Sequence, residues 1–365
     1  MIRPHPLRGA NPFKLGVFSA NADGGLTLTK VPERWQARWP DIVAVARMAD
    51  RAGFELFLPI ARWKGFGGET NSREHSFETF TYAAGLSGVT QRIGLFSTVH
   101  VPMVHPVYAA KALAGVDHMS DGRVGLNIVA GWNPDEFAMF GIDPVEERYA
   151  QALEWHDIIC RIYAAEAPFD YDGRFYKLKG VSGRPRPLQM PRPVTLNAAF
   201  GPPGRDFAAA AADFLFTTFS DIEAGRGHIK DIRERATRTG RDIGVFTTCH
   251  VVCRTSQDEA EAYYERYAVT EADKAAVDYH MEQKRKFAGS HDEATFRLHA
   301  KRFAGGAGTY PLIGTPERIV TEMLRMHEIG FAGTTVSFVN FLAELPYFIE
   351  RVLPLMVEAG LRLPG

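Results

Sequence analysis

The chain has 365 residues, of which 45% are hydrophobic and 23% charged, the balance of a globular protein and not of a disordered one. Its 42 basic and 43 acidic residues give a formal net charge of −1, so no long-range field favours a polyanion and we expect no nucleic-acid partner. No stretch approaches roughly 18 uninterrupted apolar residues, and no apolar segment follows the basic N-terminus. We therefore expect a cytoplasmic protein without membrane association.

Strands and helices are predicted to alternate along the first half of the chain. Short apolar runs predict strands at 14–20, 54–60, 92–99 and 123–130. Apolar residues at helical spacing predict the helices that follow them, at 39–53, 76–90, 105–122 and 146–165. Four strands of this kind, each followed by a helix, predict a parallel sheet covered by helices.

The second half repeats the pattern less regularly. The segment 169–181 alternates like a hairpin, with Asp172-Gly173 as its turn. Further strands are predicted at 191–199, 213–218, 243–252 and 331–340. Further helices are predicted up to residue 212, at 221–239, at 315–330 with Thr315 as N-cap, and at 341–360. We expect Cys249 and Cys253, four residues apart in an apolar run, to be buried thiols, because three cysteines are too few for a disulfide framework.

Eight strand–helix units predict a (β/α)8 TIM barrel with insertions. The alternative, a doubly wound open sheet, needs a glycine fingerprint after the first strand, but the turn there is "SANADGG". We expect one domain over residues 1–365. Within it, the polar and charged segment 254–311 interrupts the repeat and indicates an insertion or lid.

The carboxyl ends of the strands are where a barrel of this kind carries its chemistry. The side chains expected there are Ser19, Asn21, Asp23, Ala61, Arg62, Trp63, Lys64, Ser97, Thr98, His100, Asn127, Ala130, Gly131 and Trp132. They include aromatic rings, hydroxyls, an amide and cations, with no obvious nucleophile–base pair. The histidines in this part of the chain lack metal-ligand spacing and a carboxylate cluster, so we expect no metal site.

Two segments are candidates for holding a phosphate. "GFGGET" (65–70) lacks the Lys-Ser/Thr of a P-loop and predicts a loop at the barrel mouth. Gly201 and Gly204 lie where a helix is about to start, and free N–H groups there could hold a phosphate; a tight turn is the alternative. Arg148 and Tyr149 could add a guanidinium and a phenol, the alternative for Arg148 being a surface ion pair.

Three segments carry a family resemblance: "RWKGFGGETNSREHSFETFTYAAGL", "HPVYAAKALAGVDHMSDGRVGLNIVAGWNPDEFAMFGI" and "ERY". They resemble the luciferase-like superfamily of flavin-dependent monooxygenases, and within it the branch of pyrimidine and dimethyl-sulfone monooxygenases. The resemblance implies a two-component oxidoreductase on a TIM barrel that uses reduced FMN (FMNH2) and O2, the flavin being supplied by an NAD(P)H-dependent flavin reductase. It also implies a homo-oligomer, dimeric or tetrameric, and a flavin peroxide, at C4a or N5, that oxygenates a small organic substrate such as a nitrogen heterocycle or a sulfone.

The same resemblance implies roles for individual residues. The flavin contacts carried over from the family are Ala61, Arg62, Asn127, Glu136, Arg148, Tyr149 and Gly201. Thr98 and Asn127 would frame a niche for oxygen, with Asn127 donating a hydrogen bond at the flavin edge; an amide that only satisfies strand-end backbone is the alternative. His100 is a candidate for acid–base work or substrate orientation.

Trp63 and Trp132 are candidates for flanking a flat or apolar substrate, or for packing the barrel mouth. Arg62 stands where the pyrimidine enzymes have lysine, which agrees better with the sulfone branch. Gly201 stands where they have a serine, which would leave the phosphate to backbone N–H groups. Two other functions stay open: a deazaflavin-dependent oxidoreductase on the same barrel, and a non-catalytic flavin-binding protein.

Overall fold

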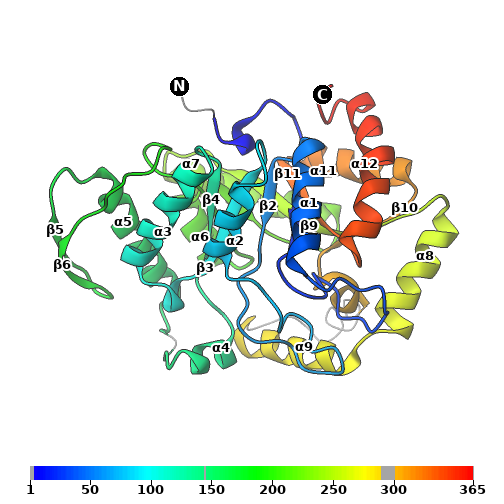
Figure 1. Cartoon of the computed structure of the whole chain (residues 1–365), viewed down its shortest axis with the longest axis horizontal. Coiled ribbons are helices and arrows are strands. Elements are labelled where there is room, and N and C mark those ends of the chain that lie inside the picture. Colours follow the sequence, from blue (N-terminus) through cyan, green and yellow to red (C-terminus); the bar gives the residue numbers. More distant parts are fainter. Residues whose placement is uncertain (1–3, 144, 289–300, 365) are drawn as a thin grey trace.

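The structure is a computed structural model that describes residues 4–143, 145–288 and 301–364. Eight parallel strands form a closed barrel, in the order β1-β2-β3-β4-β7-β8-β9-β11, with β11 pairing back to β1 (Figure 1). These strands are β1 (Lys14–Phe18), β2 (Leu56–Leu58), β3 (Gly94–His100), β4 (Val124–Val129), β7 (Val194–Ala198), β8 (Phe214–Phe216), β9 (Gly244–Cys253) and β11 (Gly333–Ser337). Each lies within, or within a residue of, a predicted strand, so the predicted barrel is confirmed.

Eight helices cover the barrel, again as predicted. They are α1 (Trp39–Arg51), α2 (Thr79–Ser87), α3 (Pro106–Met119), α5 (Arg148–Ala164), α6 (Pro202–Ala211), α7 (Ile222–Arg238), α11 (Pro316–Ile329) and α12 (Phe341–Glu358). Thr315 caps α11 as expected, since its side chain accepts from the Arg318 N–H at 3.5 Å. The helix α11 then ends at Gly330, whose φ of 109° is a left-handed conformation that favours glycine.

The remaining elements lie between these units. They are the short helices η1 (Pro6–Arg8), η2 (Val101–Met103) and α4 (Pro134–Met139), the strands β5 (Phe169–Asp172), β6 (Lys177–Val181) and β10 (Tyr310–Gly314), the helices α8 (Gln257–Glu265) and α9 (Lys274–Ala288), and the π-helical turn η3 (Arg266–Thr270). The predicted hairpin is confirmed, because β5 and β6 pair antiparallel. Its turn lies later in the chain than expected, since Asp172 still pairs with Lys177 and the Gly173 N–H donates to the Tyr176 carbonyl.

The segment predicted as an insertion, 254–311, contains α8, η3, α9 and the start of β10; its residues 289–300 lie outside the described residues. The strand β10 was not predicted. It pairs parallel with the second half of β9, Cys249–Cys253, whereas β8 pairs with the first half, Gly244–Phe246. The long strand β9 therefore exchanges one neighbour for another along its length.

The barrel interior is filled by one hydrophobic cluster. Its buried members are Leu7, Leu56, Leu58, Phe96, Val194, Leu196, Phe216 and Phe246. A Cβ on Gly125 would lie 2.2 Å from the Phe96 ring, so that glycine leaves the ring its space inside the barrel. Because side chains alternate along a strand, Thr98 and His100 share the inner face with Phe96, and Asn127 shares it with Gly125.

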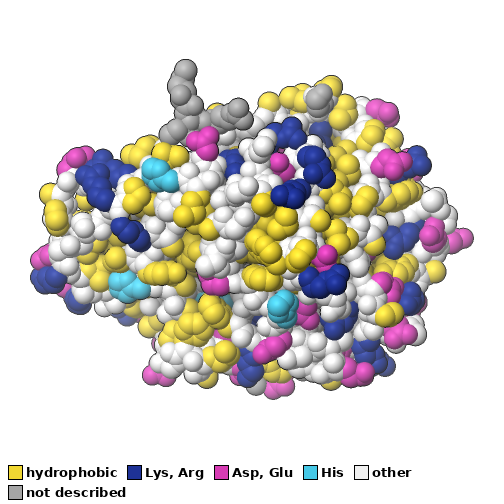
Figure 2. Space-filling view, in the orientation of Figure 1, with side chains coloured by type: hydrophobic (Ala, Val, Ile, Leu, Met, Phe, Trp, Pro, Cys, Tyr) yellow, Lys and Arg dark blue, Asp and Glu magenta, His cyan; other side chains and the backbone are white. Residues whose placement is uncertain are grey.

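A second cluster fills the space between strands and helices and includes Cys249 and Cys253, which are buried free thiols as predicted. The helices α4 and α9 lie together at the end of the molecule away from both chain termini (Figure 1). On the face shown in Figure 2, basic and acidic side chains are interspersed. None of the helices in the described part of the chain has the length and apolar character needed to cross a bilayer.

Candidate functional site

A buried ion pair joins the end of β2 to α4. Arg62 Nη1 donates to Glu136 Oε1 at 3.0 Å, and the two side chains are 6% and 0% exposed. The Trp63 N–H donates to the same oxygen at 2.9 Å. The helix α4 begins here because the side chain of its N-cap, Asn133, accepts from the Asp135 N–H at 3.1 Å. Two donors therefore saturate one oxygen of Glu136.

Aromatic rings hold the Arg62 guanidinium in place. Its central carbon lies 4.9 Å from the Trp132 ring centroid and 5.0 Å from that of Phe66. Burial lowers the pKa of Arg62, although neighbouring Glu136 acts in the opposite direction. Its Nε is enclosed without a hydrogen-bond partner among the described residues, so one donor of this guanidinium stays available.

The side chains of Thr98 and Asn127 form a hydrogen-bonded chain across β3 and β4. Thr98 Oγ1 donates to the Pro59 carbonyl at 2.6 Å, and Asn127 Nδ2 donates to Thr98 Oγ1 at 3.2 Å. The carbonyl can only accept, so the hydroxyl proton is committed to it and the Asn127 amide must donate. One of the two N–H groups of the Asn127 amide is thus used by Thr98, and the expected donor role at the flavin edge stays a prediction for the other. The enclosed atom left without a partner in the described structure is its acceptor, Oδ1.

His100 lies two residues beyond Thr98, on the same inner face of β3. Its Nδ1 is 3.6 Å from Glu136 Oε2, and the two side chains are 3% and 0% exposed. Burial, with Arg62 adding to it, lowers the pKa of His100 to about 3, so the imidazole is neutral near pH 7. Both Nδ1 and Oε2 are enclosed without a hydrogen-bond partner among the described residues.

The starts of α5 and α6 meet next to the β4–α4 connection. Arg148 Nη1 donates to the Gly131 carbonyl at 3.1 Å, and its guanidinium lies 5.4 Å from the Tyr149 ring centroid. Arg148 thus makes no surface ion pair in the described structure, which was the alternative considered. A Cβ on Gly204 would lie 2.6 Å from the Tyr149 hydroxyl, so Gly204 lets that hydroxyl approach the first turn of α6.

The first turn of α6 does not offer the free N–H groups that the sequence suggested. Gly201 is the N-cap, and the first two helical residues, Pro202 and Pro203, carry no N–H. The N–H groups of Gly204 and Arg205 both donate to the Gly201 carbonyl at 3.1 Å. The proposed row of helix amides is therefore wrong, because prolines and an internal turn use up its donors.

The two candidate substrate tryptophans pack in different places. Trp63 is 39% exposed and meets Phe140 edge-on, with ring centroids 5.0 Å apart. Trp132 lies over Arg62 and edge-on to His280, with centroids 6.0 Å apart. Ala61 precedes Arg62 in the chain and is partly exposed. Of the two tryptophan rings, that of Trp132 thus packs on the buried ion pair, which Trp63 contacts only through its backbone N–H.

Contacts made by α9 and the residue before it were missed from the sequence. Tyr279 donates a hydrogen bond to the Asp135 carboxylate, which ties α9 to α4. The Asp273 carboxylate accepts from both the N–H and the hydroxyl of Thr70 at 2.8 Å, which ties the glycine-rich 65–70 loop to the start of α9. These partners are 144 and 203 residues apart, so no local pattern could indicate them.

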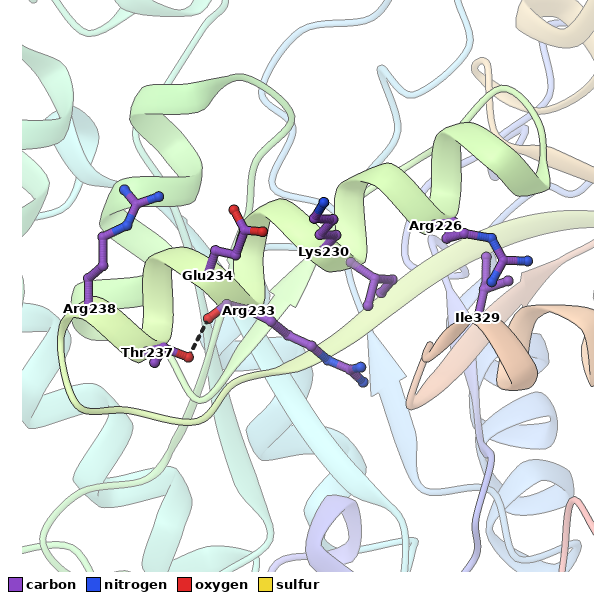
Figure 3. Close-up of a pocket in the computed structure, with 8 residues that line it drawn as sticks. Arg226, Lys230, Arg233, Glu234, Thr237, Arg238 and Ile329 are labelled. Atoms are coloured by element: carbon purple, nitrogen blue, oxygen red, sulfur yellow. Dashed lines mark hydrogen bonds between the residues drawn. The ribbon is translucent and has the colours of Figure 1, made fainter.

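A separate depression lies along α7 and does not include any of these residues. Figure 3 shows its lining, in which Arg226, Lys230 and Arg233 project from α7 and Ile329 comes from α11. The Thr237 hydroxyl there donates to the Arg233 carbonyl within the helix at 2.9 Å. This surface belongs to the outer helical layer, and the buried polar residues lie inside the barrel.

Comparison with known proteins gives one consistent result. A family model described as luciferase-like monooxygenase matches residues 13–333. The chain is 28% identical over 360 residues to an FMNH2-dependent dimethylsulfone monooxygenase of Pseudomonas putida, with 96% of each chain covered. It is 27% identical over 362 residues to pyrimidine monooxygenase RutA of a Bradyrhizobium species, with 96% of this chain and 98% of the relative covered.

A similar solved structure is DmoA from Hyphomicrobium sulfonivorans, with a TM-score of 0.84 at 20% identity over 95% of this chain and 88% of that one. At that identity the structural likeness shows the fold. The family model, in contrast, spans most of the sequence, including every residue of the buried ion pair and of the Thr98–Asn127 chain. The chain belongs to the luciferase-like monooxygenase family.

Proposed function

We propose that this protein is an FMNH2-dependent monooxygenase of the two-component type, which inserts one oxygen atom of O2 into a small organic substrate. Family membership supports the class of reaction, and the relatives named above use reduced FMN. The observation that carries the proposal is a set of enclosed polar atoms inside the barrel that lack partners among the described residues: Arg62 Nε, Glu136 Oε2 and Asn127 Oδ1. Buried polar groups normally find partners, so these point to a polar ligand.

The residues fit the ring of a flavin. A flavin ring carries hydrogen-bond donors and acceptors along one edge, and Arg62 Nε offers a donor and Asn127 Oδ1 an acceptor. Asn127 Oδ1 would accept from a ring N–H, and the Thr98 chain holds that amide in one orientation. When bound, reduced FMN supplies the electrons that activate O2, while the protein orients it and excludes water.

The phosphate group of FMN would be held by fewer protein groups than the sequence suggested. The Tyr149 hydroxyl and the N–H of Gly201 lie at the start of α6, and the Arg148 guanidinium next to the Tyr149 ring would add a third donor. A charge-assisted hydrogen bond from Arg148 would contribute more than a neutral one. The open space at Gly201, where a Cβ would meet only Pro203 at 3.9 Å, leaves room for a phosphate.

The finer features stay proposals. We propose that a flavin reductase supplies FMNH2, that the protein is a homo-oligomer, and that Trp132 with Trp63 borders the substrate. The insertion 254–311 would act as a lid, and its ties from Asp273 and Tyr279 to the barrel mouth support that role. The choice between a nitrogen heterocycle and a sulfone, and between C4a and N5 chemistry, stays a prediction.

Oxygen consumption tests the function. FMN, a flavin reductase and NADH would be supplied with a panel of heterocycles and sulfones, and products identified by mass in 18O2. One labelled atom per product and substrate-dependent O2 uptake are expected. Turnover that proceeds anaerobically with a deazaflavin would replace this function with the reductase alternative. FMN binding without any turnover would leave a flavin-binding protein.

A further inference from the structure

The geometry points to His100 as a hydrogen-bond acceptor that selects substrates bearing an N–H or O–H group, with Glu136 as the positioning residue that fixes its tautomer. The inference about substrate rests on the proposed function, because it places the substrate in the flavin cavity. The inference about the tautomer is independent of the proposed function. It follows from the directions of the hydrogen bonds around Glu136.

The proton on His100 is assigned by the carboxylate next to it. Nδ1 and Glu136 Oε2 are 3.6 Å apart, and each is enclosed without another partner in the described structure. A carboxylate oxygen can only accept, so an unprotonated Nδ1 would set two acceptors against each other. A neutral imidazole carries one ring proton, and that proton therefore belongs on Nδ1, directed at Oε2.

The other ring nitrogen, Nε2, is then unprotonated and can accept a hydrogen bond. Nε2 has no hydrogen bond to the described residues, but unlike Nδ1 it is not enclosed. It therefore carries the lone pair of the neutral ring on the inner face of β3, two residues beyond Thr98, in a side chain that is 3% exposed. The charged groups around the imidazole are Glu136 from α4 and Arg62 from the end of β2, and they form an ion pair with each other.

This arrangement determines a substrate class. A ligand N–H or O–H placed against Nε2 gains a hydrogen bond, whereas a methylated analogue buries that lone pair without a partner. Sites built around such a hydrogen bond reject analogues that lack the donor. Substrates such as lactams, imides and phenols are therefore favoured over sulfones without a donor.

Substitution of Glu136 by Gln should reverse the tautomer. Two donors, Arg62 Nη1 and the Trp63 N–H, converge on Oε1, so the amide oxygen of Gln would stay there. Its NH2 group would then face Nδ1 and make Nδ1 an acceptor, which moves the ring proton to Nε2. The control is Glu344→Gln, since Glu344 is another buried carboxylate, paired with Arg254 at 3.0 Å.

The tautomer is measured in the flavin-free protein by 15N NMR of labelled histidine at pH 7, with His100→Gln to assign the signal. Wild type and Glu344→Gln should show a protonated Nδ1, and Glu136→Gln a protonated Nε2. A wild-type His100 protonated on Nε2, or on both nitrogens, overturns the assignment. The wild-type spectrum decides this even where Glu136→Gln does not fold.

The substrate class is measured on the FMN-bound protein by following the Nε2 resonance during titration with pyrrolidinone and with N-methylpyrrolidinone. Pyrrolidinone, which carries an N–H, should shift the Nε2 resonance and bind about tenfold or more tightly than N-methylpyrrolidinone. An equal shift with both, or none with pyrrolidinone, overturns the selectivity. Failure of FMN to bind would instead refute the proposed function, while the tautomer result would stand.

Discussion

Asn127 donates its amide N–H to Thr98, and the direction of that hydrogen bond is set by a third group, the carbonyl of Pro59. The hydroxyl of Thr98 is thus a relay that fixes the orientation of the Asn127 amide. In register, the two residues lie opposite each other on β3 and β4. An amide with a fixed orientation can serve as a preorganised partner for a ligand.

Removal of the relay tests this orientation. Thr98→Val keeps the shape but takes away a buried hydroxyl, leaving the Pro59 carbonyl and the Asn127 amide without it. We expect a loss of about 1–3 kcal/mol in the free energy of unfolding and a rise in O2 uptake not coupled to product. Urea unfolding and the ratio of product to O2 measure the two effects.

Thr79→Val is the matched control. The Thr79 hydroxyl is also buried and donates to a backbone carbonyl, that of Thr98, at 2.7 Å, but from α2 on the outer layer. This substitution should lower the free energy of unfolding and leave the ratio of product to O2 as in wild type. Equal uncoupling by both variants would contradict the role of the Thr98 hydroxyl.

Gly204→Ala should weaken FMN binding. The added Cβ would meet the Tyr149 hydroxyl at 2.6 Å and the Ala199 Cβ at 2.5 Å, so the phenol must move from the start of α6. We expect the FMN dissociation constant to rise about tenfold, measured by fluorescence quenching. Gly227→Ala in α7 is the control, because nothing lies within 4 Å of that Cβ and helix propensity predicts a gain of about 0.5–1 kcal/mol. Unchanged FMN affinity in Gly204→Ala would exclude Tyr149 from the phosphate site.

Arg62→Met should be among the most destabilising single changes at the barrel mouth. It leaves the fully buried Glu136 carboxylate without its counter-charge, for which we expect a cost of about 3–5 kcal/mol. The comparison is Arg325→Met, which removes the exposed i,i+3 partner of Glu322 and should leave the melting temperature unchanged. A melting temperature for Arg62→Met equal to that of wild type would show that the buried pair contributes no net stability.

Acid should destabilise the protein through its buried histidines. Burial lowers the pKa of His250 from its usual 6.5 to about 3, so the unfolded chain binds this proton more readily than the native one. Stability therefore rises with pH between about 3 and 6.5 and is lost as pH falls through that window, by up to about 1.4 kcal/mol per pH unit for this group.

His250→Gln should flatten the dependence of unfolding free energy on pH in that window. The variant can keep hydrogen bonds to Thr309 and Tyr264, which His250 makes at 2.9 and 3.3 Å. His118→Gln, at an exposed position, is the control and should retain the wild-type slope. Urea titrations at several pH values measure these slopes. Parallel slopes for wild type and His250→Gln would contradict the contribution of His250 to the pH dependence of stability.

The barrel could be predicted from the sequence because its strands are buried on both faces and its helices on one. The runs at 92–99 and 123–130 are mostly apolar, and each is followed by a helix with a clear start and end. The strand β10 was not predicted because "YPLIG" is short, contains proline and follows a glycine-rich stretch. Only its pairing with Cys249–Cys253 makes it a strand.

For the candidate site, the positions of residues could be predicted from the sequence, but their mutual geometry could not. Arg62, Thr98, Asn127 and His100 could be placed at strand ends from their positions in the chain. Their mutual geometry could not, because an orientation such as that of the Asn127 amide depends on a carbonyl from another strand end. The Pro202-Pro203 pair was visible in the sequence, and its missing N–H groups were a signal against the helix-amide phosphate site.

The change of neighbour along β9 has a consequence for how this enzyme can diverge. The chain that leaves β9 at Cys253 and returns at Tyr310 starts and finishes on two strands that are already side by side. The rungs between β8 and β9 that close the ring, at Gly244–Phe246, lie before that departure point. The intervening segment can therefore be lengthened, shortened or exchanged without opening the ring, while β3 and β4 keep their pairing.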